Sequence, residues 1–225
     1  MAKAIEDLFF YLLFLTDILI IVFFFIFFKK NRTEKGLWTI TIYCFIDLVV
    51  NLLGEAGPTY SVMATLYSLF TFIEYSTFAY FLWLHIKNPL FRKLIALISI
   101  VFSIFLAIYN KFYGIRSLDS VPIGIETILI LIFIFYYLFE QANDKTNLFI
   151  YSHYQFWAVT GFMIYLAGSF FIYILANQIN RELLERYWFL TNALYVVKNL
   201  FIGVAFFINI KKKRLNPRKF SPYLN

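Results

Sequence analysis

The sequence predicts an all-α fold, a polytopic membrane bundle of seven transmembrane helices. Composition, mean hydropathy and the spacing of apolar segments each support this prediction. Of 225 residues, 62% are hydrophobic and 15% are charged, and the mean hydropathy is +0.74. Soluble domains have about 45–50% apolar and about 25% charged residues. A soluble core of this size could not bury 30 Phe and 17 Tyr, so the composition excludes a soluble enzyme, a nucleic-acid-binding domain and a disordered chain.

Seven apolar stretches are long enough to cross a bilayer, which takes about 17–25 residues per helix. They run from Asp7 to Phe28, Leu37 to Leu53, Tyr60 to Ile86, Leu94 to Tyr109, Val121 to Phe139, Tyr154 to Ala176 and Trp188 to Ile210. Backbone groups in lipid must pair inside helices or closed barrels, and these stretches are longer than barrel strands. We therefore expect one transmembrane domain over residues 1–210 and a basic cytoplasmic tail over residues 211–225.

Lysine and arginine are distributed unevenly between the two sides of the expected bundle. Most of the 20 follow the first, third, fifth and seventh spans, and few lie in the segments on the opposite side. Because cytoplasmic loops are enriched in Lys and Arg, the N-terminus is expected outside and the C-terminus inside. This orientation requires an odd number of spans. The four tryptophans lie near helix ends, as an aromatic belt requires: Trp38, Trp83, Trp157 and Trp188.

The tail carries a dense cluster of positive charge. Its basic residues are Lys211, Lys212, Lys213, Arg214, Arg218 and Lys219. Such a cluster is expected to contact anionic lipid or an acidic cytoplasmic partner. The simpler interpretation is ordinary flanking charge on the cytoplasmic side of the last span.

Ionisable residues within the spans are the first place to look for function, because each costs about 3 kcal/mol or more at the bilayer centre. They are Asp17, Asp47, Glu74, Glu126 and Lys198. His85 and His153 lie at inner helix ends and are expected at headgroup depth. At ~1.5 Å per residue, Glu74 and Lys198 lie near mid-membrane. Lys198 then has up to three carboxylates as candidate partners.

Polar residues continue from these positions along helical faces. Asp47, Asn51 and Glu55 are spaced i, i+4, i+8, and Tyr195, Lys198 and Asn199 share a face of the last span. These faces should point inward and leave Phe, Leu and Ile for lipid. We therefore expect an outward-facing polar pocket that binds a small ligand, an ion or a proton. Its expected lining is Asp47, Asn51, Glu74, Glu126, Tyr195 and Lys198, and Asp17 and Asn199 complete the buried polar core.

Glu74 and Lys198 are candidates for a buried ion pair. Aligning the inner ends of the third and seventh spans superimposes the two residues. The first three and last three spans run in the same directions, which is the geometry of a parallel 3+1+3 repeat. A pseudo-twofold axis would then make the two charges face each other. The alternatives for the pair are a structural salt bridge that fixes helix register, and a role in sensing, proton movement or cofactor attachment.

Motifs for enzyme chemistry are absent from the sequence. There is no His-x-x-x-His, Gly-x-Ser-x-Gly or Gly-rich phosphate loop. One cysteine, Cys44, and two histidines leave little for a disulfide, metal or haem site. We therefore expect no catalytic residues and no metal.

Two known families share parts of this layout. Lys198 in the seventh span, with a carboxylate in the third, resembles the retinal site of microbial rhodopsins, which would make Lys198 the cofactor-binding residue. Leu194 stands where that family usually has Asp, and the expected aromatic motifs are missing. The 3+1+3 layout resembles SWEET sugar carriers, whose Pro-Gln motifs are also missing. A small-solute or ion transporter and a retinal protein are therefore the alternatives.

The chain is also similar to a group of small seven-helix membrane proteins of Bacteroidota. The similarity lies in Ile73-Glu74-Tyr75, Glu126-Thr127-Ile128-Leu129, Phe156-Trp157 with Tyr165 and Gly168, and Val197-Lys198-Asn199-Leu200-Phe201. The resemblance implies a bacterial inner-membrane subunit that senses a signal or anchors a cytoplasmic sensor kinase. The leading expectation is a non-enzymatic sensing or scaffold subunit, either alone in the lipid bilayer with its partner or in a larger membrane complex.

Overall fold

The computed structural model describes residues 2–57, 59–115, 119–144, 149–175, 178 and 180–215, without the side chains of 2–6, 30, 181–186 and 212–215. In this part of the chain the structure is entirely helical. The elements are α1 (Ala2–Ile26), α2 (Phe28–Asn31), α3 (Lys35–Glu55), α4 (Tyr60–His85), α5 (Pro89–Tyr113), α6 (Ser120–Asn143), the 3-10 turn η1 (Ile150–Ser152), α7 (Tyr154–Leu175) and α8 (Arg181–Leu215).

The long helices coincide with the predicted spans. Six of the described helices are long and apolar enough to cross a membrane, namely α1, α3, α5, α6, α7 and α8. The chain is therefore a multi-pass membrane protein. The remaining long helix, α4, has 26 residues but carries more polar side chains, among them Ser68, Thr71 and Glu74. Composition alone therefore does not mark α4 as a span, and its crossing of the membrane remains a prediction.

Local sequence explains where the helices begin and end. The Asn88 side chain accepts hydrogen bonds from the backbone N of Leu90 and Phe91, and Pro89 occupies the first turn of α5. For this reason α5 begins five residues earlier than the apolar stretch predicts. Its end is followed by Gly114 at φ +74°, a conformation that favours glycine. Asp119 caps α6 in the same way, by accepting from the backbone N of Val121.

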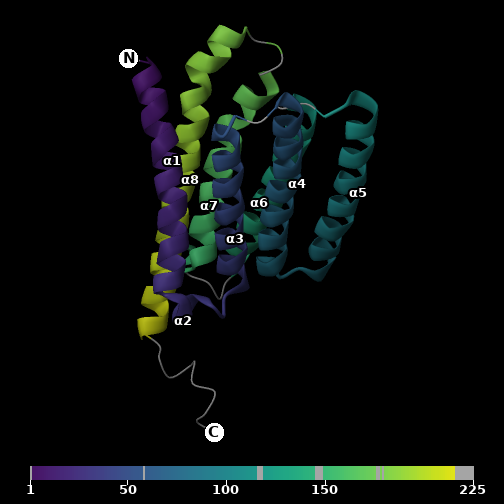
Figure 1. Cartoon of the computed structure of the whole chain (residues 1–225). Helices are drawn as coiled ribbons and strands as arrows, with labels where there is room; N and C mark the ends of the chain where they lie inside the picture. Colours follow the sequence, from purple (N-terminus) through teal and green to yellow (C-terminus); the bar gives the residue numbers. More distant parts are fainter. Residues whose placement is uncertain are drawn as a thin grey trace.

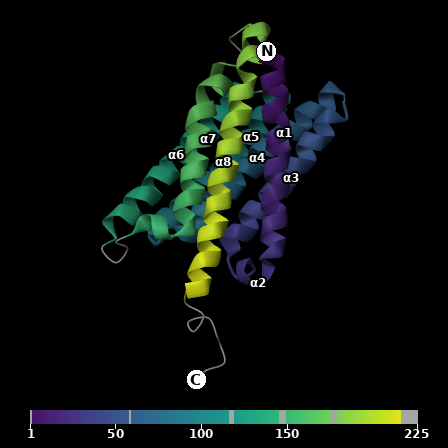
Figure 2. The same ribbon diagram turned by 90° about the vertical axis from the view of Figure 1, so that its left-hand side faces the viewer.

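Six of the long helices form a closed ring, in the order α1, α3, α4, α6, α7 and α8, with α8 packed against α1 (Figures 1 and 2). The seventh, α5, lies outside the ring against α4 and α6. We call the end of the bundle that holds the start of α1 the upper end, and the end that holds α2 the lower end, as drawn in Figure 1. In the ring α4 and α6 run in the same direction, as do α8 and α1.

Aromatic rings and glycines pack the interior of this ring. Phe78 of α4 and Phe162 of α7 stack with ring centroids 4.1 Å apart, so these two helices meet across the ring. On the other side of α7, Gly161 allows a close approach to α8. A Cβ on Gly161 would lie 2.9 Å from the Cβ of Phe201 and 3.0 Å from the carbonyl oxygen of Lys198. Small residues commonly permit such contacts between membrane helices.

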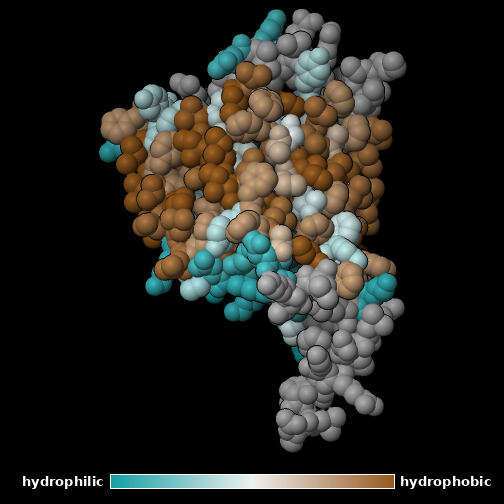
Figure 3. All heavy atoms as spheres, turned by 180° about the vertical axis from the view of Figure 1, so that it is seen from behind, coloured by the Kyte–Doolittle hydropathy of each residue, from teal (hydrophilic) through white to brown (hydrophobic). Residues whose placement is uncertain are grey.

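The outer surface is apolar around the middle of the bundle. Large apolar side chains such as Leu97, Phe135 and Phe207 are exposed there. Figure 3 shows a continuous hydrophobic belt on one face, with hydrophilic side chains gathered above and below it. A soluble monomer rarely exposes an apolar surface of this extent, whereas lipid or neighbouring membrane proteins would cover it.

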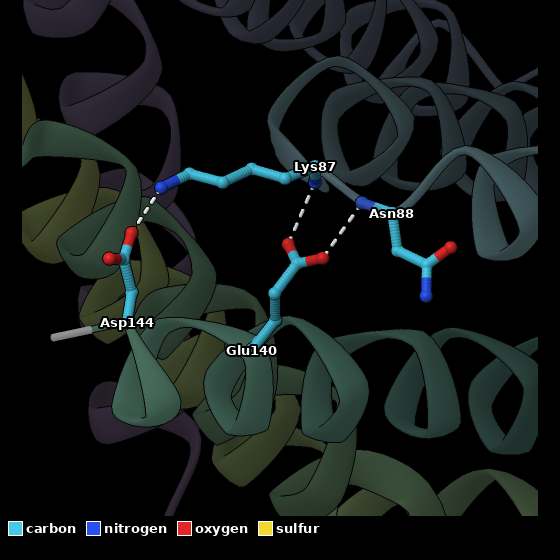
Figure 4. Close-up of polar contacts among 4 residues, drawn as sticks. All are labelled: Lys87, Asn88, Glu140 and Asp144. Atoms are coloured by element: carbon cyan, nitrogen blue, oxygen red, sulfur yellow. Dashed lines mark hydrogen bonds and ion pairs between the residues drawn. The ribbon is translucent and has the colours of Figure 1, made fainter. Parts of the chain in front are cut away.

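A polar cluster at the lower end holds the start of α5 against the end of α6 (Figure 4). The Glu140 carboxylate accepts hydrogen bonds from the backbone N of Lys87 at 2.7 Å and of Asn88 at 2.8 Å. The Lys87 ammonium pairs with Asp144, and the Asn88 side chain donates to the Tyr136 hydroxyl. These contacts satisfy backbone donors in the α4–α5 turn that would otherwise lack partners.

Candidate functional site

A cavity of about 450 Å³ lies in the upper half of the ring, and each of the six ring helices contributes to its wall. Asp7, Tyr11 and Glu55 are exposed at the mouth. Asp47 and Glu74 are buried deeper in the wall. A volume of this size is in the usual range for small-molecule sites.

The chemical character of the wall is acidic and aromatic. Five carboxylates line it, and none of the described lining residues is Lys, Arg or His; the acids are Asp7, Asp47, Glu55, Glu74 and Glu126. Eight aromatic side chains stand between them, which are Phe10, Tyr11, Tyr67, Phe70, Tyr165, Tyr173, Trp188 and Tyr195. Carboxylates and the faces of aromatic rings both attract cations.

A three-residue hydrogen-bonded chain lies at the floor of the cavity. The Lys198 ammonium donates to the Tyr43 hydroxyl at 2.9 Å, and that hydroxyl donates to Glu74 Oε1 at 2.6 Å. Tyr43 therefore connects α8 to α4 from its own position on α3. Because the hydroxyl both accepts and donates, it satisfies the buried ammonium and the buried carboxylate together.

Aromatic rings enclose the Lys198 ammonium. Its Nζ lies 3.3 Å from the ring centroid of Tyr195, 4.4 Å from that of Tyr43 and 4.8 Å from that of Tyr165. The side chain has no solvent-exposed surface. Tyr165 and Tyr195 also line the cavity, whereas Lys198 does not, so these rings separate the ammonium from the cavity. Contacts of this kind stabilise a buried cation by about 2 kcal/mol when water is excluded.

A second polar cluster, at the interface of α1 and α8, surrounds Asp17. Asn199 donates to Asp17 Oδ1 at 2.9 Å and to the Thr16 hydroxyl at 3.0 Å. The Tyr195 hydroxyl donates to the same Asp17 oxygen at 3.4 Å. This cluster fixes α1 on α8, and Tyr195 joins it to the cavity wall.

The structure brings together most, but not all, of the predicted pocket. Asp47, Asn51, Glu74, Glu126 and Tyr195 line the cavity as expected. Asn51 donates to Asp47 Oδ2 at 2.9 Å, as their i, i+4 spacing suggested. Lys198 lies beneath the cavity instead of in its wall. Asp17 and Asn199 lie behind it, and both are fully or almost fully buried.

Tyr43 is a site residue that the sequence did not predict. A direct Glu74–Lys198 ion pair was expected, but the Tyr43 hydroxyl stands between the two charges. A signal was present, because Tyr43 lies four residues before Asp47 and extends the Asp47–Asn51–Glu55 face by one turn. A buried tyrosine in a chain with 17 of them did not stand out.

The described residues offer little to hold a metal or a retinal. No three of their His, Cys, Asp and Glu side chains are grouped closely enough to bind a metal ion. A retinal linked to Lys198 would need free space at Nζ, where three tyrosine rings lie within 4.8 Å. His85 is held by the carbonyl oxygen of Phe81 at 2.7 Å and by the Tyr154 hydroxyl at 3.0 Å, which is a packing role at the lower end.

Of the predicted lipid- or partner-binding residues, Lys211 is exposed at the lower end of α8. The side chains of Lys212, Lys213 and Arg214, and all of Arg218 and Lys219, lie outside the described residues. Comparison with protein-family models, curated proteins and solved structures finds no match to this chain. Its function must therefore be argued from the site itself.

Proposed function

We propose that the protein is a sensing subunit of the bacterial inner membrane that binds a small ligand in the acidic, aromatic cavity. The observation that carries this proposal is the closed floor of the cavity. Tyr43 and Lys198 are buried beneath it, and Phe78 and Phe162 stack across the ring. A cavity that opens at one end and is closed at the other suits a receptor, which holds its ligand without passing it on.

The proposed orientation has seven spans, with the upper end outside and the lower end in the cytoplasm. In support, the lower end carries basic residues on four segments, including Lys35, Lys87, Arg92 and Lys211. The guanidinium of Arg92 lies 4.0 Å from the ring centroid of Trp83, an interfacial pairing of the kind found at membrane boundaries. The helix that brings the number of spans from six to seven in this proposal is α4, whose polar residues reflect its place in the cavity wall.

The Tyr43 chain offers a route from ligand to cytoplasm. A ligand that draws Glu74 toward the cavity weakens its bond to the Tyr43 hydroxyl, and Lys198 then loses the neutralising partner at the far end of the chain. Lys198 belongs to α8, which continues from the cavity to Leu215 beyond the lower end of the ring. A ligand-dependent shift between two arrangements of α8 would reach a cytoplasmic partner such as a sensor kinase.

Orientation and coupling have separate tests. Cys44 is fully buried, so cysteines introduced at Glu55 and Lys211 can be labelled selectively with a membrane-impermeant thiol reagent. In right-side-out vesicles we expect labelling at position 55 and none at 211; the reverse pattern contradicts the orientation. Native purification with mass spectrometry should then recover a stoichiometric partner that has a cytoplasmic domain.

A small-solute or ion transporter of the 3+1+3 type is the second candidate, favoured by one repeated contact. Trp38 Nε1 donates to the Arg32 carbonyl oxygen, and Trp157 Nε1 donates to the Tyr151 carbonyl oxygen, each six residues earlier in the chain. These tryptophans lie at equivalent positions of the two expected triplets, α1-α3-α4 and α6-α7-α8. Flux of a solute or protons in proteoliposomes would support the transporter and overturn the sensing subunit.

A further inference from the structure

Glu126 in α6 is a cavity residue with an unfilled hydrogen-bonding position. Its side chain is only 2% exposed and lines the cavity. The Oε1 atom is buried and accepts no hydrogen bond from any described residue. Buried acceptors in native proteins nearly always have partners, so an unpartnered carboxylate oxygen at a cavity wall indicates a donor that arrives from outside the chain.

The surroundings of Glu126 specify the charge of that donor. Glu74 and Asp47 line the same cavity, and the described lining residues include no basic side chain. A ligand that carries a carboxylate or a phosphate would meet carboxylates in the described wall, whereas the Lys198 ammonium lies behind the Tyr165 and Tyr195 rings. A cation would relieve the repulsion among these groups and donate a hydrogen bond to Glu126 in the same step.

The rings of the wall specify the kind of cation. The chain already places one ammonium group, that of Lys198, among tyrosine rings at 3.3 to 4.8 Å. Two of these rings, those of Tyr165 and Tyr195, also line the cavity. The rings of Tyr173 and Trp188 line it as well, with their centroids 6.1 Å apart. Such a wall binds the apolar body of an organic cation as well as its charge.

A bare metal ion fits the cavity poorly. The cavity volume of about 450 Å³ is many times that of a single ion with its ligands. The described carboxylates are also too dispersed to form a metal-binding group. Both observations favour a cation that has a carbon skeleton.

We propose that the cavity binds a small organic amine in its ammonium form. The ammonium group donates to Glu126 Oε1, and the organic body packs against Tyr165, Tyr173 and Trp188. This inference deepens the sensing function proposed above and rests on it. It names the class of ligand and the residue that selects the ligand by charge.

The test uses the purified full-length protein in lipid nanodiscs with three ammonium probes that carry N–H donors: propylamine, putrescine and phenethylamine. Binding is measured by titration calorimetry at pH 7, where each probe is charged. The matched neutral probe is 2-phenylethanol, which has the shape of phenethylamine but no charge. We expect at least one ammonium probe to bind, and 2-phenylethanol to bind at least about tenfold more weakly than phenethylamine. Equal binding of these two, or no binding of any ammonium probe, overturns the proposal.

Two variants locate the site. Glu126→Gln keeps the shape of the side chain but removes its charge, and should weaken ammonium binding at least about tenfold. Glu140→Gln makes the same chemical change further along α6, at the lower end and outside the cavity, and should alter binding less than about threefold, since a charge far from the site is screened. Unchanged binding in Glu126→Gln overturns the assigned residue. If that variant fails to fold, the comparison of phenethylamine with 2-phenylethanol on the unaltered protein still decides the ligand class.

The outcome also separates this inference from the proposed function. Ammonium binding together with ammonium flux in proteoliposomes would keep the ligand class and overturn the sensing subunit. Recovery of a stoichiometric cytoplasmic partner without any ammonium binding would keep the sensing subunit and overturn the ligand class.

Discussion

The Tyr43 hydroxyl accepts a hydrogen bond from the Lys198 ammonium at 2.9 Å and donates one to Glu74 Oε1 at 2.6 Å. Three helices are therefore joined at the floor of the cavity by one side chain. Lys198 and Glu74 compensate each other's charge through this hydroxyl and not by direct contact.

Tyr43→Phe should destabilise the protein by about 3 kcal/mol, because it leaves a buried ammonium and a buried carboxylate each without a partner. Thermal unfolding in detergent measures the change. Tyr80→Phe on α4 is the matched control, since Tyr80 is exposed and should change the stability by less than about 0.5 kcal/mol. Equal melting temperatures of the two variants would show that the hydroxyl does not hold the charges.

Lys198→Met should preserve the fold and abolish coupling to the partner. Methionine is close to lysine in length and packs well against aromatic rings, and the bond from Tyr43 to Glu74 can remain. The expected result is a folded protein that loses less stability than Tyr43→Phe, because Glu74 keeps its hydrogen bond from Tyr43, together with loss of the signalling output. Lys198→Ala, which leaves a cavity among the rings, should instead cost about 3 kcal/mol of stability. A normal output from Lys198→Met would show that the Lys198 ammonium has a structural role and no part in signalling.

Two glycines provide a test of helix packing. Gly161→Ala places a Cβ within 3.0 Å of α8 backbone and side-chain atoms, whereas a Cβ on Gly203 meets nothing within 4 Å. We expect Gly161→Ala to destabilise by about 1–3 kcal/mol through overpacking. Gly203→Ala should be neutral or stabilising by up to about 1 kcal/mol, because alanine favours the helix. Chemical or thermal unfolding of the two single variants side by side gives the comparison.

Asn199→Ala should loosen the contact between α1 and α8. The amide donates to both Asp17 and Thr16, and its loss leaves the buried Asp17 carboxylate short of a donor, at a cost of about 2 kcal/mol. Asn143→Ala is the control, since the Asn143 amide donates to the Phe139 carbonyl oxygen at the exposed end of α6. Hydrogen exchange in the upper half of α1 should increase in the first variant and not in the second.

Glu140→Ala should free the start of α5. The carboxylate accepts from two consecutive backbone N–H groups, those of Lys87 and Asn88, so its removal leaves both without their partner. Limited proteolysis at the α4–α5 turn should become faster, while the cavity, to which α5 contributes no residue, keeps its ligand affinity. Loss of affinity in this variant would mean that α5 acts on the ring from outside.

The sequence was sufficient to predict the helices because apolar length and polar breaks are local properties. Each of the seven predicted stretches falls largely on one long helix, although α1 ends at Ile26 and not at the predicted Phe28, and the predicted end at Ala176 lies outside the described residues. The ionisable residues of the spans point inward, as the cost of exposing them to lipid requires. The predicted stretch from Leu94 to Tyr109 was shorter than α5, because a charged first turn at Arg92 and Lys93 hides the helix start in a hydropathy pattern.

The site was less predictable because it depends on which helices are neighbours. No local pattern shows that the Tyr43 side chain of α3 reaches both α4 and α8 inside the ring, so Tyr43 could not be placed between Glu74 and Lys198. Nor could the sequence show that Tyr165 and Tyr195 cover the lysine and exclude it from the cavity wall. Helical periodicity identifies a face, but only the packing of several faces determines which of their residues meet.

The position of α5 outside the ring has a consequence for biosynthesis. This helix contributes nothing to the cavity wall, yet it returns the chain to the upper end before α6 begins, so α6, α7 and α8 run through the bundle in the same directions as α1, α3 and α4 (Figure 1). If α5 failed to insert, the second triplet would be inverted. The Lys198 helix would then run antiparallel to α1 instead of alongside it in the same direction. The most peripheral helix therefore determines the direction in which the last three helices run, and errors in its insertion would prevent the ring from closing.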